Sequence, residues 1–116
     1  MEKYIVSLFE IRDIAQIFHW QTMSYAQHKA SDMFLKNILN FTDKLVESHM
    51  GRFGRINFFE SSSIKVTNID KNMFTLKLKD LMSKLEDVKF PDDTENIKCE
   101  IISLINQTLY LLSFKD

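Results

Sequence analysis

The sequence predicts an all-α protein, an antiparallel four-helix bundle, on three observations. Apolar residues recur at spacings of three and four in four separate segments, which is the period of a helix with one buried face. The chain has only two glycines and one proline, too few turn residues for an all-β fold. Its apolar fraction of 45%, with ten phenylalanines, is enough for a core. The length of 116 residues indicates one domain, 1–116.

The first two helices are expected over residues 3–24 and 27–50. Ile5, Leu8 and Phe18 belong to the apolar stripe of the first helix, and Phe34 and Ile38 to that of the second. Glycine commonly follows the last residue of a helix because it adopts positive φ at no steric cost. Gly51 is therefore predicted to end the second helix, and Gly54 to continue the break.

The third and fourth helices are expected over residues 71–88 and 93–114. Asp70 is the predicted N-cap of the third, and Asp92 or Asp93 that of the fourth, after the break at Pro91. About twenty residues, 51–70, connect the second helix to the third. A connection of this length is unusual in a small domain, so we expect it to contain a short helix or to be a packed functional loop.

Charge and cysteine content exclude several classes of function. The net charge is −1 and neither end carries a basic block, which argues against nucleic acid as the partner. The single cysteine, Cys99, excludes an internal disulfide and is interpreted as a small apolar residue of the fourth helix. No apolar run is long enough to cross a membrane, and no signal peptide is evident. We expect a soluble, cytoplasmic protein.

The residues that indicate chemistry lie on the second predicted helix: His28, Asp32, Asp43 and Glu47. At about 100° per residue they fall within an arc of roughly 100°. His28 with Asp32, and Asp43 with Glu47, form two i,i+4 pairs, whose members are neighbours on a helix surface. Imidazole and carboxylate are ligands for iron, manganese and zinc. A solvated charged face is the alternative interpretation of the same pattern.

The two pairs cannot bind one metal ion within one chain, because eleven residues of helix separate Asp32 from Asp43 by roughly 16 Å. Two copies of the helix packed antiparallel about a two-fold axis near residues 37–38 would bring them together. The His28 and Asp32 end of one copy would then face the Asp43 and Glu47 end of the other. The stripe therefore predicts a homodimer or a higher homo-oligomer with shared metal sites.

His19 is a fifth candidate, in the apolar run Ile17-Phe18-His19-Trp20 near the end of the first predicted helix. His28 stands across the predicted turn between the two helices, and the two are considered together. Either it is a hydrogen-bonded core residue, or it joins His28 as a ligand.

These residues resemble a known signature. Phe18-His19-Trp20, then His28-x3-Asp32, then Asp43-x3-Glu47, is similar to the ferroxidase motif of Dps mini-ferritins, members of the ferritin-like superfamily. The resemblance covers about residues 15–50. His19 and His28 stand about three residues closer together than in that family, and the ExxH motif of larger ferritins is absent.

The resemblance implies a ferritin-like bundle whose sites, shared across a two-fold dimer interface, bind Fe(II) and oxidise it with peroxide or O2. The protein would then be a ferroxidase with Trp20 beside the metal. The implied ligands are His19, His28, Asp32, Asp43 and Glu47.

The stretch from His19 to Ala30 also resembles short ferritin-like proteins of phages and large DNA viruses. This second resemblance implies an alternative: a non-enzymatic viral structural or interaction protein, in the host cytoplasm or the virion, that retains the bundle. Its acidic stripe would hold a structural Zn or Mn, or nothing. In a third alternative, the 51–70 connection recognises a partner.

Overall fold

A computed structural model describes residues 1–58, 60 and 65–114. It contains four α-helices, α1 (Glu2–Gln21), α2 (Tyr25–Phe53), α3 (Lys71–Glu86) and α4 (Asp92–Leu112), and no strand within those ranges. The prediction of an all-α protein with four helices is therefore confirmed. Within the described ranges, no helix is both long enough and apolar enough to cross a membrane.

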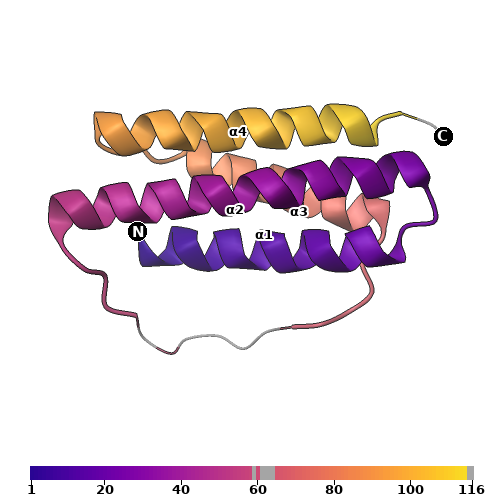
Figure 1. Ribbon diagram of the computed structural model, residues 1–116, viewed down its shortest axis with the longest axis horizontal. Helices are drawn as coiled ribbons and strands as arrows, with labels where there is room; N and C mark the ends of the chain where they lie inside the picture. Colours follow the sequence, from indigo (N-terminus) through magenta and orange to yellow (C-terminus); the bar gives the residue numbers. More distant parts are fainter. Residues whose placement is uncertain (59, 61–64, 115–116) are drawn as a thin grey trace.

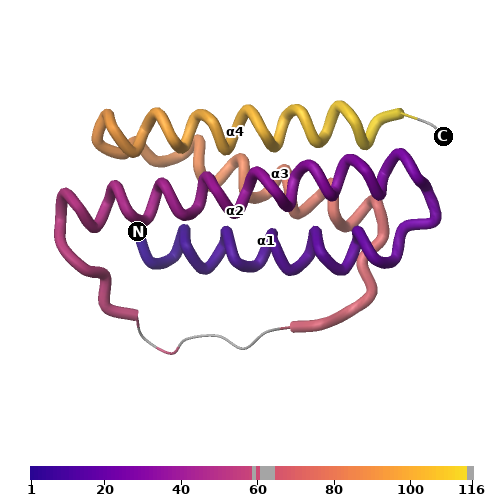
Figure 2. Tube along the Cα trace, viewed as in Figure 1, coloured from indigo at the N-terminus to yellow at the C-terminus, as the bar shows by residue number. Residues whose placement is uncertain are grey.

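Each helix packs against two others. Both α2 and α3 contact α1 and α4, so that the four surround one core. Figure 1 places the short turn between α1 and α2 at one end of the molecule and the end of α2 at the other. The same view places the start of α3 near the α1–α2 turn, so the connection between α2 and α3 returns along the length of the bundle, as the trace in Figure 2 also shows.

Three phenylalanines from three helices meet in the core. The ring of Phe74 on α3 lies 4.9 Å from that of Phe18 on α1 and 5.9 Å from that of Phe34 on α2, measured between centroids. All three are at most 1% exposed. Ile101 and Ile105 of α4, which are fully buried, belong to the same core. The apolar stripes predicted from spacing therefore face one another.

The first helix is shorter than predicted. It ends at Gln21, because Thr22 has extended backbone angles, and residues 22–24 make the turn. Ser24 then caps α2 by accepting a hydrogen bond from the backbone N–H of Gln27. Asp70, the predicted cap of α3, accepts from the N–H of Met73, which confirms that prediction.

The prediction that Gly51 ends the second helix was wrong. The helix continues through Gly51 to Phe53, and Gly54 adopts a φ of 88°, where its N–H still donates to the Met50 carbonyl. A glycine inside a helix costs only about 1 kcal/mol, so Gly51 alone does not stop it. The helix stops where positive φ is actually adopted.

Two features of the fourth helix also differ from the predictions. Pro91 is its N-cap, and Asp92 and Asp93 lie in its first turn, where carboxylates interact favourably with the helix dipole. Cys99, interpreted as a small apolar residue of the fourth helix, lies on that helix and is exposed. α3 ends at Glu86, two residues earlier than predicted.

The described parts of the 51–70 connection contain no helix beyond Phe53; residues 59 and 61–64 lie outside the described ranges. Its last residues are fixed to the bundle. The Gln21 side chain accepts a hydrogen bond from the Ile69 N–H at 2.8 Å and donates to the Asn68 side chain at 2.9 Å. Ile69 is 5% exposed and packs in the core.

A buried charge pair closes the link between α3 and α4. The Lys98 ammonium lies 2.6 Å from the Glu95 carboxylate and also donates to the Val88 carbonyl. Glu95 accepts from the Phe90 N–H at 2.8 Å. The Lys98 side chain is 6% exposed and that of Glu95 20%. The hydrogen bond from Lys98, followed by that from Phe90, lowers the pKa of Glu95 below its usual value.

We expect Glu95→Gln to lower the free energy of unfolding at pH 7 by about 2 kcal/mol, because the substitution removes a charge-assisted hydrogen bond from a buried ammonium. A carboxylate whose pKa is depressed by folding stabilises the protein above its unfolded pKa, and this contribution is lost as pH falls through the folded pKa. Urea denaturation between neutral pH and pH values below the usual glutamate pKa measures both effects. Wild type should lose more stability on acidification than Glu95→Gln.

Glu100→Gln is the matched control, since Glu100 is exposed on the same helix. It should change stability by at most about 0.5 kcal/mol. A loss as large as that of Glu95→Gln would show that the buried pair is not the cause.

Candidate metal centre

His19 and His28, on either side of the α1–α2 turn, lie against each other. Their rings stack with centroids 3.8 Å apart and planes inclined by 20°. The Nδ1 atom of His19 lies 3.0 Å from the backbone carbonyl oxygen of His28, and Nδ1 of His28 lies 3.0 Å from the carbonyl oxygen of His19. The pair is therefore joined by two reciprocal hydrogen bonds as well as by ring contact.

These contacts fix the tautomer of both rings. A carbonyl oxygen only accepts hydrogen bonds, so each Nδ1 carries the proton and donates it. In a neutral imidazole the other nitrogen, Nε2, then holds the lone pair. Ligating histidines commonly have this arrangement, in which one ring nitrogen donates to a carbonyl and the other binds the metal.

A buried serine supports the pair. The Ser31 hydroxyl lies 3.0 Å from Nδ1 of His19 and 3.0 Å from the carbonyl oxygens of Gln27 and His28. Sequence reasoning missed this residue. The available signal was its position: Ser31 stands three residues before Phe34 and seven before Ile38, on the apolar stripe, where a polar side chain needs a buried partner.

Asp32 lies one helical turn beyond His28 and is ionised near neutral pH. Its carboxylate makes an ion pair with Lys36 at 3.1 Å. The hydrogen bond from Lys36 lowers the pKa of Asp32 below its usual value; desolvation opposes this shift, and the positive charge of Lys36 adds to it. The Lys36 side chain is 75% exposed, and an exposed i,i+4 pair of this kind is weak.

Asp43 and Glu47 are exposed further along α2. Neither makes an ion pair with a described residue. Helix rise separates them from the His28 and Asp32 end by roughly 16 Å. In the described part of the chain, no three His, Cys, Asp or Glu side chains are grouped closely enough to hold one metal ion. Of the five candidates, the structure brings only His19 and His28 into contact. Asp32 stands one turn beyond His28 at the same end of α2, and Asp43 and Glu47 lie further along that helix, so the candidates fall into a His19, His28 and Asp32 part and an Asp43 and Glu47 part.

Large apolar side chains are exposed along the same helix and at its start. Tyr25, Leu39 and Phe53 of α2 are 72%, 56% and 59% exposed. From a helix period of 100° per residue, all three lie on the side of α2 that carries the candidate ligands. Trp20, predicted to lie beside the metal, is 73% exposed on α1. Exposed apolar side chains are typical of an interface; large ones are also exposed on the other three helices, among them Phe9, Leu76 and Tyr110.

Comparison with known proteins gives one match. The model of a family described as a family of unknown function (DUF5856) matches residues 19–112. The matched range begins at His19 and includes all five candidate ligands. No curated protein matches the chain, and no solved structure does.

Proposed function

The chain belongs to the DUF5856 family, whose function is unknown, and we propose its function from its own site: a Dps-like, ferritin-type protein that binds Fe(II) and oxidises it at sites shared between two copies. The observation that carries this proposal is the locked histidine pair. Reciprocal Nδ1 to carbonyl bonds between His19 and His28 leave the Nε2 atom of each ring as the nitrogen that can bind a metal ion.

Asp32 supplies the first carboxylate. Like any aspartate of ordinary or lowered pKa, it is an anion at neutral pH and needs no deprotonation before it binds a cation. Lys36 occupies it in the absence of metal. A divalent ion would displace this exposed ammonium readily, since the ion pair is weak.

The remaining ligands would come from a second copy. If two α2 helices pack antiparallel about residues 37–38, His28 faces Glu47 of the second copy and Asp32 faces Asp43 of the second copy. In the same register, Tyr25 lies opposite Met50 of the second copy. Leu39, near the two-fold axis, is covered by the second α2 helix. The exposed apolar side chains of α2 support this choice, because their burial would stabilise the dimer.

The ferritin-like arrangement is part of the proposal. Ferritin-like bundles have neighbouring antiparallel helices and one long crossover. The packing of α1 and α4 each between α2 and α3, together with the long return from α2 to α3 (Figure 1), supports it.

In the proposed reaction, Fe(II) is the substrate. Carboxylate ligands stabilise the harder Fe(III) ion and so lower the potential of the couple. Each iron gives up one electron; two irons reduce one peroxide, whose O–O bond breaks to give two hydroxide ions. Ligands from both copies would hold the iron while the oxidant reaches its open positions.

Iron oxidation, followed by the ultraviolet absorbance of Fe(III), tests the proposal. With anaerobic Fe(II) and then peroxide or O2, wild type should oxidise iron faster than iron alone, and Asp32→Asn should be slower by at least about tenfold. Asp80→Asn, an exposed aspartate of α3, is the control and should match wild type. Wild type no faster than iron alone, or Asp32→Asn equal to wild type, would refute the ferroxidase and leave a non-enzymatic bundle.

A further inference from the structure

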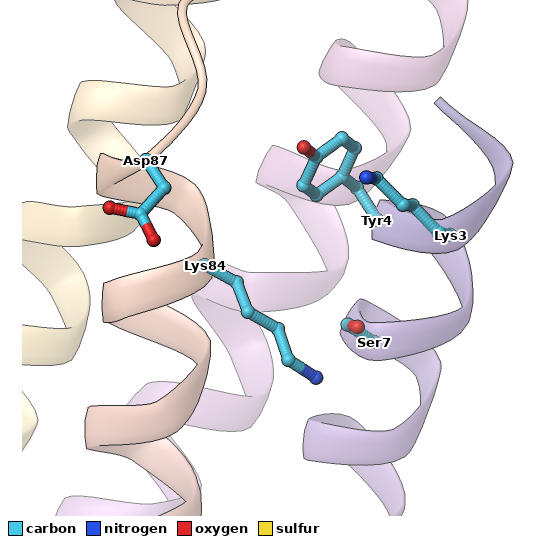
Figure 3. A pocket seen from close by; sticks show the side chains of 5 residues that line it. All are labelled: Lys3, Tyr4, Ser7, Lys84 and Asp87. Atoms are coloured by element: carbon cyan, nitrogen blue, oxygen red, sulfur yellow. The ribbon is translucent and has the colours of Figure 1, made fainter.

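A separate cavity of about 380 Å³ lies between the first turns of α1 and the end of α3, lined by Lys3, Tyr4, Ser7, Lys84 and Asp87. Figure 3 shows Lys84 extending from α3 toward Ser7, with Tyr4 and Lys3 on α1 across from α3. The first turns of α1 are at the opposite end of that helix from His19 (Figure 1). The cavity is therefore distinct from the candidate metal centre.

Two ammonium groups at this cavity have no carboxylate partner. Among the described residues, no acidic side chain lies within ion-pair distance of Lys3 or Lys84. Lys3 is placed over the Tyr4 ring, 5.2 Å from its centroid. Asp87 lines the cavity from the end of α3 but forms no ion pair with either lysine. The cavity thus combines two positive charges with one negative charge.

The half-buried Ser7 hydroxyl differs from three fully buried hydroxyls on the other helices. Ser31, Thr42 and Thr108 each donate to the carbonyl four residues earlier, at 2.7–3.0 Å. Ser7 makes no such bond in the described structure. A hydroxyl that does not bond to its own helix is available to a ligand.

The ring of Tyr4 is held in place by its packing. It meets the ring of Phe90 edge-on, with centroids 5.3 Å apart and planes at 81°, and Phe90 is 8% exposed. The Tyr4 side chain, which lines the cavity, is therefore already ordered before a ligand binds. This lowers the entropic cost of an interaction with its hydroxyl.

From these contacts we infer that this cavity binds the phosphate group of a small phosphate monoester. Lys3 and Lys84 supply charge, and the hydroxyls of Ser7 and Tyr4 donate hydrogen bonds to phosphate oxygens. The volume is in the range of small-molecule sites. Asp87 would repel a bare anion but accepts a hydrogen bond from a hydroxyl, which favours a phosphorylated sugar or polyol over inorganic phosphate.

Titration of the ¹⁵N-labelled full chain, followed by amide chemical shifts, tests this inference. The two probes are ribose 5-phosphate and inorganic phosphate, at fixed ionic strength because charge attraction is screened by salt. We expect saturable shifts at residues 3–7 and 84–87, with tighter binding of ribose 5-phosphate. Lys84→Met should weaken binding by about tenfold, the loss of one charge-assisted hydrogen bond.

Lys79→Met is the matched control, since Lys79 is exposed on the same helix and does not line the cavity. It should change affinity less than about twofold. An equal loss of affinity in both variants would show that only general charge attraction is measured, which would overturn the site. Chemical shifts that do not saturate would also overturn it. Equal affinity for the two probes would overturn the assignment to a monoester. None of these results depends on metal binding.

Discussion

Phe74→Ala is expected to lower the free energy of unfolding by about 3–5 kcal/mol. Phe74 is fully buried, and its ring contacts those of Phe18 and Phe34. Removing the ring leaves a cavity between three helices that cannot collapse, because each wall belongs to a different rigid element. Urea denaturation followed by far-ultraviolet circular dichroism measures the change. A domain of this size has little stability in reserve, so the variant should be close to unfolding.

Leu76→Ala is the control on the same helix, because Leu76 is 57% exposed. It should cost no more than about 1 kcal/mol. If Phe74→Ala does not fold at all, Phe74→Leu, which keeps most of the volume, should fold with a loss smaller than 3 kcal/mol. A loss for Phe74→Ala no larger than that for Leu76→Ala would contradict the central role of the ring.

The helices could be predicted because their signals are local. The three- and four-residue spacing of apolar residues around Phe18 and Phe34 identifies the apolar face of each of those helices. Asp70 caps α3 through a bond to a residue three positions away. The end of α2 could not be predicted from local signals. Gly51 and Gly54 carry the same local signal, and the structure uses only the second.

Two buried contacts of polar groups escaped prediction for a physical reason. Ile69 joins the core because Gln21, 48 positions earlier, accepts its N–H. Lys98 is buried because Glu95 and the Val88 carbonyl surround its ammonium. Composition alone assigns a lysine and a loop residue to the surface. Only the packed bundle supplies their partners.

The candidate site was likewise predictable from the sequence only in part. The spacing of His28, Asp32, Asp43 and Glu47 places them on one face of α2, and His19 across the turn follows from the order of the two helices. The stacking of the rings depends on the course of residues 22–24. There Thr22 is extended and its hydroxyl bonds to the Gln27 side chain at 3.1 Å. The turn therefore decides whether two histidines become a pair.

The proposed sharing of sites predicts that two inactive variants will restore activity when mixed. Asp32→Asn damages the His19, His28 and Asp32 part of both sites in a dimer, and Glu47→Gln damages the other part of both. A dimer with one copy of each variant has one site with both defects and one intact site. After refolding an equal mixture, about half the dimers are mixed. About a quarter of wild-type oxidation should therefore return.

Asp32→Asn mixed with His28→Ala is the matched control, because both changes fall in the same part and every mixed dimer keeps two damaged sites. This mixture should stay at the level of either variant alone. Size-exclusion chromatography of the same samples should give a dimer or a larger assembly. Recovery in the control mixture, no recovery in the first, or a strictly monomeric protein would each contradict a site shared between copies. Recovery in the first mixture alone requires that Asp32 of one copy and Glu47 of another act on the same iron, because neither variant contains an intact site by itself.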